Sequence, residues 1–179
     1  YKTVESLDDC KQIQLDLNSI VDYCNKNDLP LNINKCHSIT FTRKKHVIHH
    51  TYQLNNCNIA SVDEVRDLGV ILDTKWCFNS HIDRIINQSN KMLGFIRRYS
   101  RHFNSPTTLL SLYYAFVHSN ISFASTIWSP HYYVHVKRLE SIQHKFLRVL
   151  AYKSGITISN HDYSHVMKQE KNIHLADIR

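Results

Sequence analysis

Residues 79–100 have the sequence NSHIDRIINQSNKMLGFIRRYS, in which apolar side chains recur every three or four positions. This period predicts an amphipathic α-helix from Ser80 to about Ser100, with Asn79 or Ser80 as its N-cap. The face predicted to be buried comprises Ile82, Ile85, Ile86, Met92, Leu93, Ile96 and Tyr99. Basic side chains recur at seven-residue spacing on roughly the opposite face: Arg84, Lys91 and Arg98. One helix is therefore expected to carry an apolar stripe backed by a basic stripe.

More helices are predicted downstream of this stretch. Ser105 followed by Pro106 is a typical N-cap with proline at the first helical position. It starts a helix that runs to about His118, with Phe116 among its predicted buried residues. A short helix is expected at Ser122–Trp128, a third long helix from about Tyr133 to Tyr152, and one further helix is possible near Asp162–Lys171. The long helix has an apolar face of its own, with basic residues on its other face: Lys137, Arg138, Lys145 and Arg148.

The segment upstream mixes a helix with strand-like runs. Residues 6–27 predict a helix, and Ser6 with Asp9 forms a plausible capping box at its start. Runs rich in β-branched and aromatic residues then predict strands at His37–Thr42, His46–Leu54 and Val65–Leu72. Gly69 lies inside the last run, where a glycine often marks a bulge or a close backbone approach. The predicted fold class is α+β, with a helix plus antiparallel strands followed by an all-α helical bundle.

The surplus of basic over acidic residues lies in the predicted bundle. Residues 79–153 carry ten basic and two acidic side chains, whereas the chain as a whole has a net charge of +7. Residues 1–78 and 154–179 are close to neutral. A basic stripe is often only a solvated face, but such a face usually mixes signs, with pairs at i, i+4. The scarcity of acids therefore favours a polyanionic partner.

Several classes of protein and site are not supported. No run of about 18 uncharged apolar residues occurs, so we expect no membrane span. The start of the chain lacks the pattern of a signal peptide, and with five cysteines and no CxxC pair we expect an intracellular protein with reduced thiols. Gly-rich phosphate loops are missing. Asp8-Asp9 is better explained by capping a helix than by binding metal ions. Cys57 is the only thiol near the histidine cluster at 46–50, and His161 with His165 has none, so no metal site is predicted.

Five strings of residues, in order over about residues 1–150, resemble one family. They are Leu15-Asp16-Leu17-Asn18 with Lys35-Cys36 and Ile39-Thr40-Phe41-Thr42, Val65-Arg66-Asp67-Leu68-Gly69-Val70-Ile71-Leu72-Asp73, Leu93-Gly94-Phe95-Ile96, Ala124-Ser125-Thr126-Ile127-Trp128-Ser129-Pro130, and Leu139-Glu140-Ser141-Ile142-Gln143. Taken together, the chain resembles the C-terminal part of the reverse transcriptase of jockey-like non-long-terminal-repeat retrotransposons.

The resemblance implies an RNA-directed DNA polymerase in which residues 1–78 are the C-terminal part of an incomplete palm. Residues 79–153 would be the helical thumb and residues 154–179 a short, truncated tail. The family's aromatic-Ala-Asp-Asp motif would lie just upstream of Tyr1. We therefore expect no cofactor in this fragment, although Mg²⁺ would serve the full-length enzyme. The parent activity is nucleotidyl transfer, and this fragment alone is expected to be inactive.

The same resemblance assigns supporting roles to particular residues. Lys35 would act as a general acid for the leaving pyrophosphate, because an ammonium is a mobile charge with donatable protons. The primer grip would comprise Arg66, Leu68 and Gly69. The thumb would bind a primer–template duplex through its phosphates, by means of Arg84, Lys91, Arg98, Lys137, Arg138, Lys145 and Arg148.

The expected partners are an RNA–DNA or DNA primer–template duplex and the rest of the polymerase chain, with no membrane. The family also implies nuclear action. Two alternatives remain open at this point: a helical protein-interaction module that has lost its enzymatic context, and a genomic relic without function.

Overall fold

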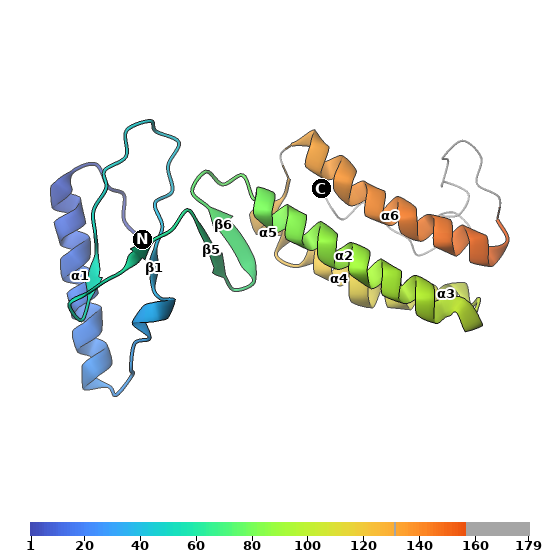
Figure 1. Ribbon diagram of the computed structural model, residues 1–179, viewed down its shortest axis with the longest axis horizontal. Helices are drawn as coiled ribbons and strands as arrows, with labels where there is room; N and C mark the ends of the chain where they lie inside the picture. The colour runs from blue at the N-terminus through green and yellow to red at the C-terminus, as the bar shows by residue number, and fades with distance from the viewer. Residues whose placement is uncertain (131, 157–179) are drawn as a thin grey trace. The chain divides into compact units, whose positions relative to one another are not determined.

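The structure is a computed structural model that describes residues 1–130 and 132–156 (Figure 1). It mixes helices with a few short strands that form small sheets. The chain divides into two compact units, the first spanning Tyr1–Cys77 and the second beginning at Phe78. Each unit is described by itself. The assignment of the two units to a palm and a thumb stays a prediction.

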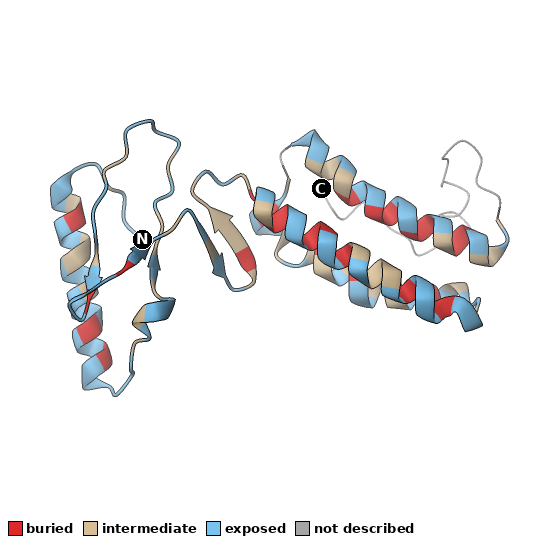
Figure 2. Cartoon of the chain, viewed as in Figure 1, coloured by how far each residue is buried: buried red, intermediate tan, exposed pale blue. Residues whose placement is uncertain are grey.

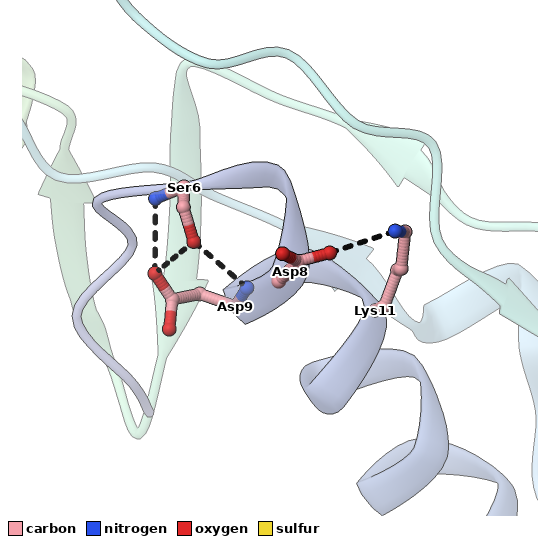
Figure 3. A network of polar contacts seen from close by, with 4 residues as sticks. All are labelled: Ser6, Asp8, Asp9 and Lys11. Carbon is pink, nitrogen blue, oxygen red and sulfur yellow. Dashed lines mark hydrogen bonds and ion pairs between the residues drawn. The ribbon is translucent and has the colours of Figure 1, made fainter.

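The first unit opens with α1 (Leu7–Lys26), and the predicted capping box is confirmed (Figure 3). The Ser6 hydroxyl accepts a hydrogen bond from the Asp9 backbone N–H at 3.3 Å, and the Ser6 backbone N–H donates to the Asp9 carboxylate at 2.9 Å. Hydrogen bonds from the Glu5 backbone N–H, then from the Ser6 hydroxyl, lower the pKa of Asp9. Asp8 makes an ion pair with Lys11 at 2.7 Å. Both carboxylates therefore have local structural roles.

After the short 3₁₀ turn η1 (Ile33–Lys35), six strands form three two-stranded pairs. Their bounds are β1 (His37–Ser38), β2 (Gln53–Leu54), β3 (Cys57–Asn58), β4 (Ala60–Ser61), β5 (Glu64–Asp67) and β6 (Val70–Asp73). β2–β3 and β5–β6 are antiparallel, whereas β1–β4 is parallel. The prediction of antiparallel strands is thus wrong for β1–β4, because the long connection between these two strands lets them run in the same direction.

The strand predictions were also too long. Only two residues of each of the runs 37–42 and 46–54 form strands, since a strand needs a neighbour to accept its backbone hydrogen bonds. The run 65–72 is not one strand but most of a hairpin. Its turn lies at Leu68 and Gly69, whose φ angles of 45° and 94° match the turn that suits two-residue hairpin loops. Gly69 therefore forms a turn rather than a bulge.

The core of the first unit is small. Val21 from α1 packs with Leu54 and Ile59, and partly buried residues surround them: Leu17, Leu31, Cys36 and Tyr52. The side chain of Gln14 in α1 also exchanges two hydrogen bonds of 2.9 Å with the backbone of Gln53. α1 is thereby joined to β2 by both apolar and polar contacts.

The second unit is helical. It contains α2 (Asn79–Tyr99), the 3₁₀ turn η2 (Ser100–His102), α3 (Pro106–Tyr113), the π-helical turn η3 (Tyr114–His118), α4 (Ser119–Ser122), α5 (Ser125–Trp128) and α6 (Tyr133–Ser154). The predicted cap of α3 is confirmed, because the Ser105 hydroxyl accepts from the Thr108 N–H at 3.4 Å. α6 ends at Gly155, whose φ of 68° suits a glycine C-cap. In the described part of the chain, no helix is both long and apolar enough to cross a membrane.

Burial follows the predicted stripes along α2 and α6 (Figure 2). The fully buried side chains of the second unit include Ile82, Ile96, Leu109, Val117, Ile121, Trp128, Ile142, Phe146, Leu147 and Leu150. The ring of Tyr113 in α3 stacks on Phe146 in α6, with centroids 4.1 Å apart. The buried hydroxyl of Ser89 accepts from the Asn120 amide at 3.1 Å, which ties α4 to α2.

Three details of the helical prediction were wrong. α2 is preceded by Phe78 in the left-handed region, with no side-chain cap, because burial of the Phe78 ring fixes the first turn. Tyr99 is 65% exposed and its ring lies against Phe95 on the outside of α2. Phe116 is 45% exposed because it lies in η3, where the extra residue of a π-turn rotates the side chains that follow. The helix predicted near 162–171 lies outside the described residues.

Replacing Ser6 by alanine should lower the stability of the first unit by about 1 kcal/mol, because an N-cap hydroxyl is lost. The measurement is urea denaturation followed by circular dichroism. Asp8→Asn is the control, since an exposed ion pair contributes little. An equal loss in both variants would contradict the capping assignment.

Lowering the pH below about 6.5 should destabilise the second unit. His81 is 2% exposed, and burial, with a smaller contribution from Arg84, lowers its pKa below the usual 6.5. The unfolded chain then binds a proton that the folded chain excludes, so stability is lost as the pH falls toward the folded-state pKa.

The ring of Trp128 lies 5.3 Å from that of His81, so its fluorescence reports on this part of the core. Thermal unfolding of a Trp76→Phe variant, in which Trp128 is the remaining tryptophan, would measure the effect between pH 7.5 and 5. A His81→Phe substitution in the same background should flatten the dependence. An unchanged slope would show that another group is responsible.

Candidate nucleic-acid interface

Basic residues from α2, η2 and α6 line one groove within the second unit. The groove has a volume of about 1450 Å³. Its cationic residues are Lys91, Arg97, Arg98, Arg101, Lys145, Arg148 and Lys153. The other described lining residues are Asn90, Leu93, Gly94, Asn104, Val149 and Tyr152, and none of them is acidic. We refer to this surface as the basic groove.

Helical spacing explains why these side chains gather. Along α2 and the following turn η2, the lining residues recur at intervals of three and four, as in Asn90, Gly94, Arg97 and Arg101. In α6, Lys145, Arg148 and Tyr152 recur in the same way. Residues at these spacings share one helix face. α2 packs against α6 (Figure 1). The basic residues of both helices therefore line the same groove.

Two of the lysines also hold the groove together. Lys145 donates a hydrogen bond to the side-chain oxygen of Asn90 at 2.9 Å, which joins α6 to α2. Lys153 donates to three oxygens at the end of α2 and just beyond it: the backbone carbonyls of Ser100 and Phe103, the latter at 3.0 Å, and the Asn104 side chain at 3.3 Å. Lys153 therefore binds backbone carbonyls at the C-terminal end of this helical segment, where basic side chains are favourable.

Four other cations of the groove are placed differently. Lys91, Arg97, Arg98 and Arg101 are exposed and, among the residues described, have no acidic partner. An uncompensated set of like charges raises the local positive potential and attracts anions from solution. These four side chains can therefore bind an anionic ligand without first giving up an ion pair to the described part of the chain.

The structure brings only part of the predicted thumb site together. Lys91, Arg98, Lys145 and Arg148 line the basic groove. The remaining predicted residues do not line it: Arg84, Lys137 and Arg138. Arg138 instead makes a 2.6 Å ion pair with Asp83, and the Lys137 ammonium lies 4.6 Å from the centre of the Tyr133 ring.

Sequence reasoning missed three cations of the groove: Arg97, Arg101 and Lys153. The seven-residue spacing used to find Arg84, Lys91 and Arg98 follows a single row along the helix. Arg97 and Arg101 belong to the adjacent row, at three and seven positions beyond Gly94. The position of α6 decides which neighbouring residues of this row line the groove. Only the structure shows that position.

The predicted sites of the first unit lie in two separate elements. Lys35 is exposed in η1, whereas Arg66 lies in β5 and Leu68 and Gly69 form the turn of the β5–β6 hairpin. The Leu68 side chain is 89% exposed at that tip. Their proposed catalytic and primer-grip roles stay predictions.

In the described ranges, no three histidine, cysteine or acidic side chains are grouped so that they could hold a metal ion. Asp8 and Asp9 are engaged in the contacts around the start of α1.

Comparison with known proteins identifies no relative. No protein-family model, curated protein or solved structure matches the chain. The groove itself and the resemblance of the five strings therefore provide the indications of function.

Replacing Lys153 by methionine should lower the stability of the second unit by about 2 kcal/mol, because charge-assisted hydrogen bonds to three oxygens are lost. Lys145→Met, which removes one exposed hydrogen bond, should cost clearly less. The comparison uses the midpoints of urea denaturation. Equal midpoints for the two variants would mean that Lys153 is not a structural lysine.

Proposed function

We propose that the basic groove binds the phosphate backbone of a nucleic-acid duplex, as the thumb of a reverse transcriptase binds its primer–template. The observation that carries the proposal is a single groove lined by seven cations, with no acidic residue among its described lining. Lysine and arginine contacts to phosphates supply affinity and fix orientation without reading sequence. The groove offers this kind of contact.

The scale of the groove suits a duplex. Lys91 and Arg101 are ten positions apart in sequence, which corresponds to about 15 Å of helix axis. Double-stranded DNA carries about one charge per 1.7 Å of its axis, so a stretch of this length presents about nine phosphate charges. That number is enough to engage the groove's cations, although only one side of the duplex can face them.

The wider identity rests on the resemblance. We propose that the chain is a palm and thumb segment of an RNA-directed DNA polymerase from a jockey-like retrotransposon. Binding, rather than nucleotidyl transfer, is the activity proposed for these 179 residues. The remaining polymerase chain as a partner, and action in the nucleus, belong to the same proposal.

One observation favours the alternative, a helical protein-interaction module. The rings of Phe95, Tyr99 and Phe116 form an exposed cluster, with centroid distances of 4.4 Å and 6.5 Å from Phe95 to the other two. Exposed aromatic residues are common at protein interfaces. This cluster lies on residues that are not part of the groove lining, so the two candidate functions are separable by mutation.

Changing Lys91, Arg98 and Arg101 together to glutamine should weaken binding to a labelled RNA–DNA hybrid duplex. The plot of log affinity against log salt should become shallower by up to about 2.7, because up to three phosphate contacts are lost. Fluorescence anisotropy between about 50 and 200 mM salt measures the slope.

The matched control changes Arg84, Lys137 and Arg138 to glutamine. It removes the same charge from the same unit, but from residues outside the groove lining. Equal loss of slope in the two triple variants would mean that net charge, not the groove, binds the duplex. Binding of the wild-type chain with no dependence on salt would contradict the proposal and favour the protein-interaction module.

A further inference from the structure

Gly94 lies at the centre of the cationic part of α2. On a helix, the surface neighbours of a residue are those three and four positions away. For Gly94 these are Asn90, Lys91, Arg97 and Arg98, and all four line the basic groove together with Gly94 itself. The one position without a side chain is thus surrounded by three cations and an amide.

Packing among the described residues does not require a glycine at this position. Apart from the adjoining residues and the surrounding helix backbone, a Cβ atom built on Gly94 meets no described atom within 4 Å. The residue lies within the regular helix α2, where glycine is less favourable than alanine because it loses more conformational freedom on folding. Glycine here therefore leaves open space on the helix surface between its cationic neighbours.

The neighbours differ in how far they are already engaged. The Asn90 amide donates to the Ile86 carbonyl at 2.9 Å, and its oxygen accepts from Lys145. Lys91, Arg97 and Arg98 have no acidic partner among the described residues. Three donors of positive charge are thus available around the gap, while Asn90 is held in place at its edge.

We infer that Gly94, Lys91, Arg97 and Arg98 form a seat for a single phosphate of a polynucleotide backbone. This inference rests on the proposed duplex binding and specifies its central contact. The non-bridging oxygens of a phosphodiester accept hydrogen bonds from guanidinium and ammonium groups. With no side chain at Gly94, the phosphate lies against the helix backbone, within reach of all three cations. A side chain there would hold it away from them.

The test introduces a side chain at the seat without changing any charge. Gly94→Leu fills the gap and Gly94→Ala fills it partly. Gln88→Leu is the matched control, since it adds leucine at an exposed position of α2 that does not line the groove. The full 179-residue chain is titrated against the same RNA–DNA hybrid at several salt concentrations.

Gly94→Leu should weaken the affinity by about tenfold or more and make the salt dependence shallower by about one unit, as expected for one lost phosphate contact. Gly94→Ala should weaken it less, yet raise the melting temperature by a few degrees because alanine favours the helix. A more stable but weaker-binding variant separates the seat from a merely structural role. Gln88→Leu should bind like the wild type.

If Gly94→Leu binds within about twofold of the wild type and with the same salt dependence, the seat is wrong, although duplex binding by the groove stands. An equal loss in Gln88→Leu would also overturn it. If the wild-type chain itself shows no salt-dependent binding, the proposed function fails and the seat fails with it. The two failures are therefore distinguishable.

Discussion

The packing of α2 against α6 places two basic helix faces side by side, and the basic groove depends on this contact. Bringing like charges together is unfavourable, but exposed charges repel weakly, by about 1 kcal/mol for a pair 4 Å apart in water. Complete burial of one large apolar side chain contributes about 1.5–3 kcal/mol. α6 alone buries Ile142, Phe146, Leu147 and Leu150 completely, so the apolar contact outweighs the repulsion.

Six of the seven cations of the groove divide into two kinds. Lys145 and Lys153 donate to oxygens of other helical elements and so help to fix the relative positions of α2, η2 and α6. The other four have no acidic partner in the described part of the chain: Lys91, Arg97, Arg98 and Arg101. The two lysines therefore stabilise the groove, whereas the other four cations, three of them arginines, can contact a ligand. Arginine suits the second task because its planar group matches two phosphate oxygens at once.

Local signals were predictable from the sequence, and tertiary ones were not. Ser6 with Asp9 and Ser105 with Pro106 specify helix starts through contacts within one turn, and both were found where predicted. Phe78 begins α2 for a different reason, the burial of its ring, and no capping pattern reveals that. Helix periodicity placed Arg98 on a basic face. Periodicity alone could not predict that Arg97 and Arg101 would line the same groove, because the position of α6 decides this.

The first unit shows the same limit for strands. The run from Val65 to Leu72 has strand composition throughout, yet the chain reverses at Leu68 and Gly69. Composition indicates that residues prefer extended backbone, whereas the partner strand decides where the turn falls. The composition of this run suggested a bulge or a close backbone approach at Gly69, because single residues do not show where a strand pairs.

A basic surface alone does not distinguish a nucleic acid from an acidic protein, since both offer negative charge. The seat inferred at Gly94 would distinguish them. Carboxylates sit at the ends of side chains and can reach a cation over an intervening methyl group or a leucine. A phosphodiester is part of the polymer backbone and must approach the helix surface as closely as the chain that carries it allows. An open helix surface among Lys91, Arg97 and Arg98 therefore favours the backbone phosphate as ligand, and this steric argument is independent of the total charge.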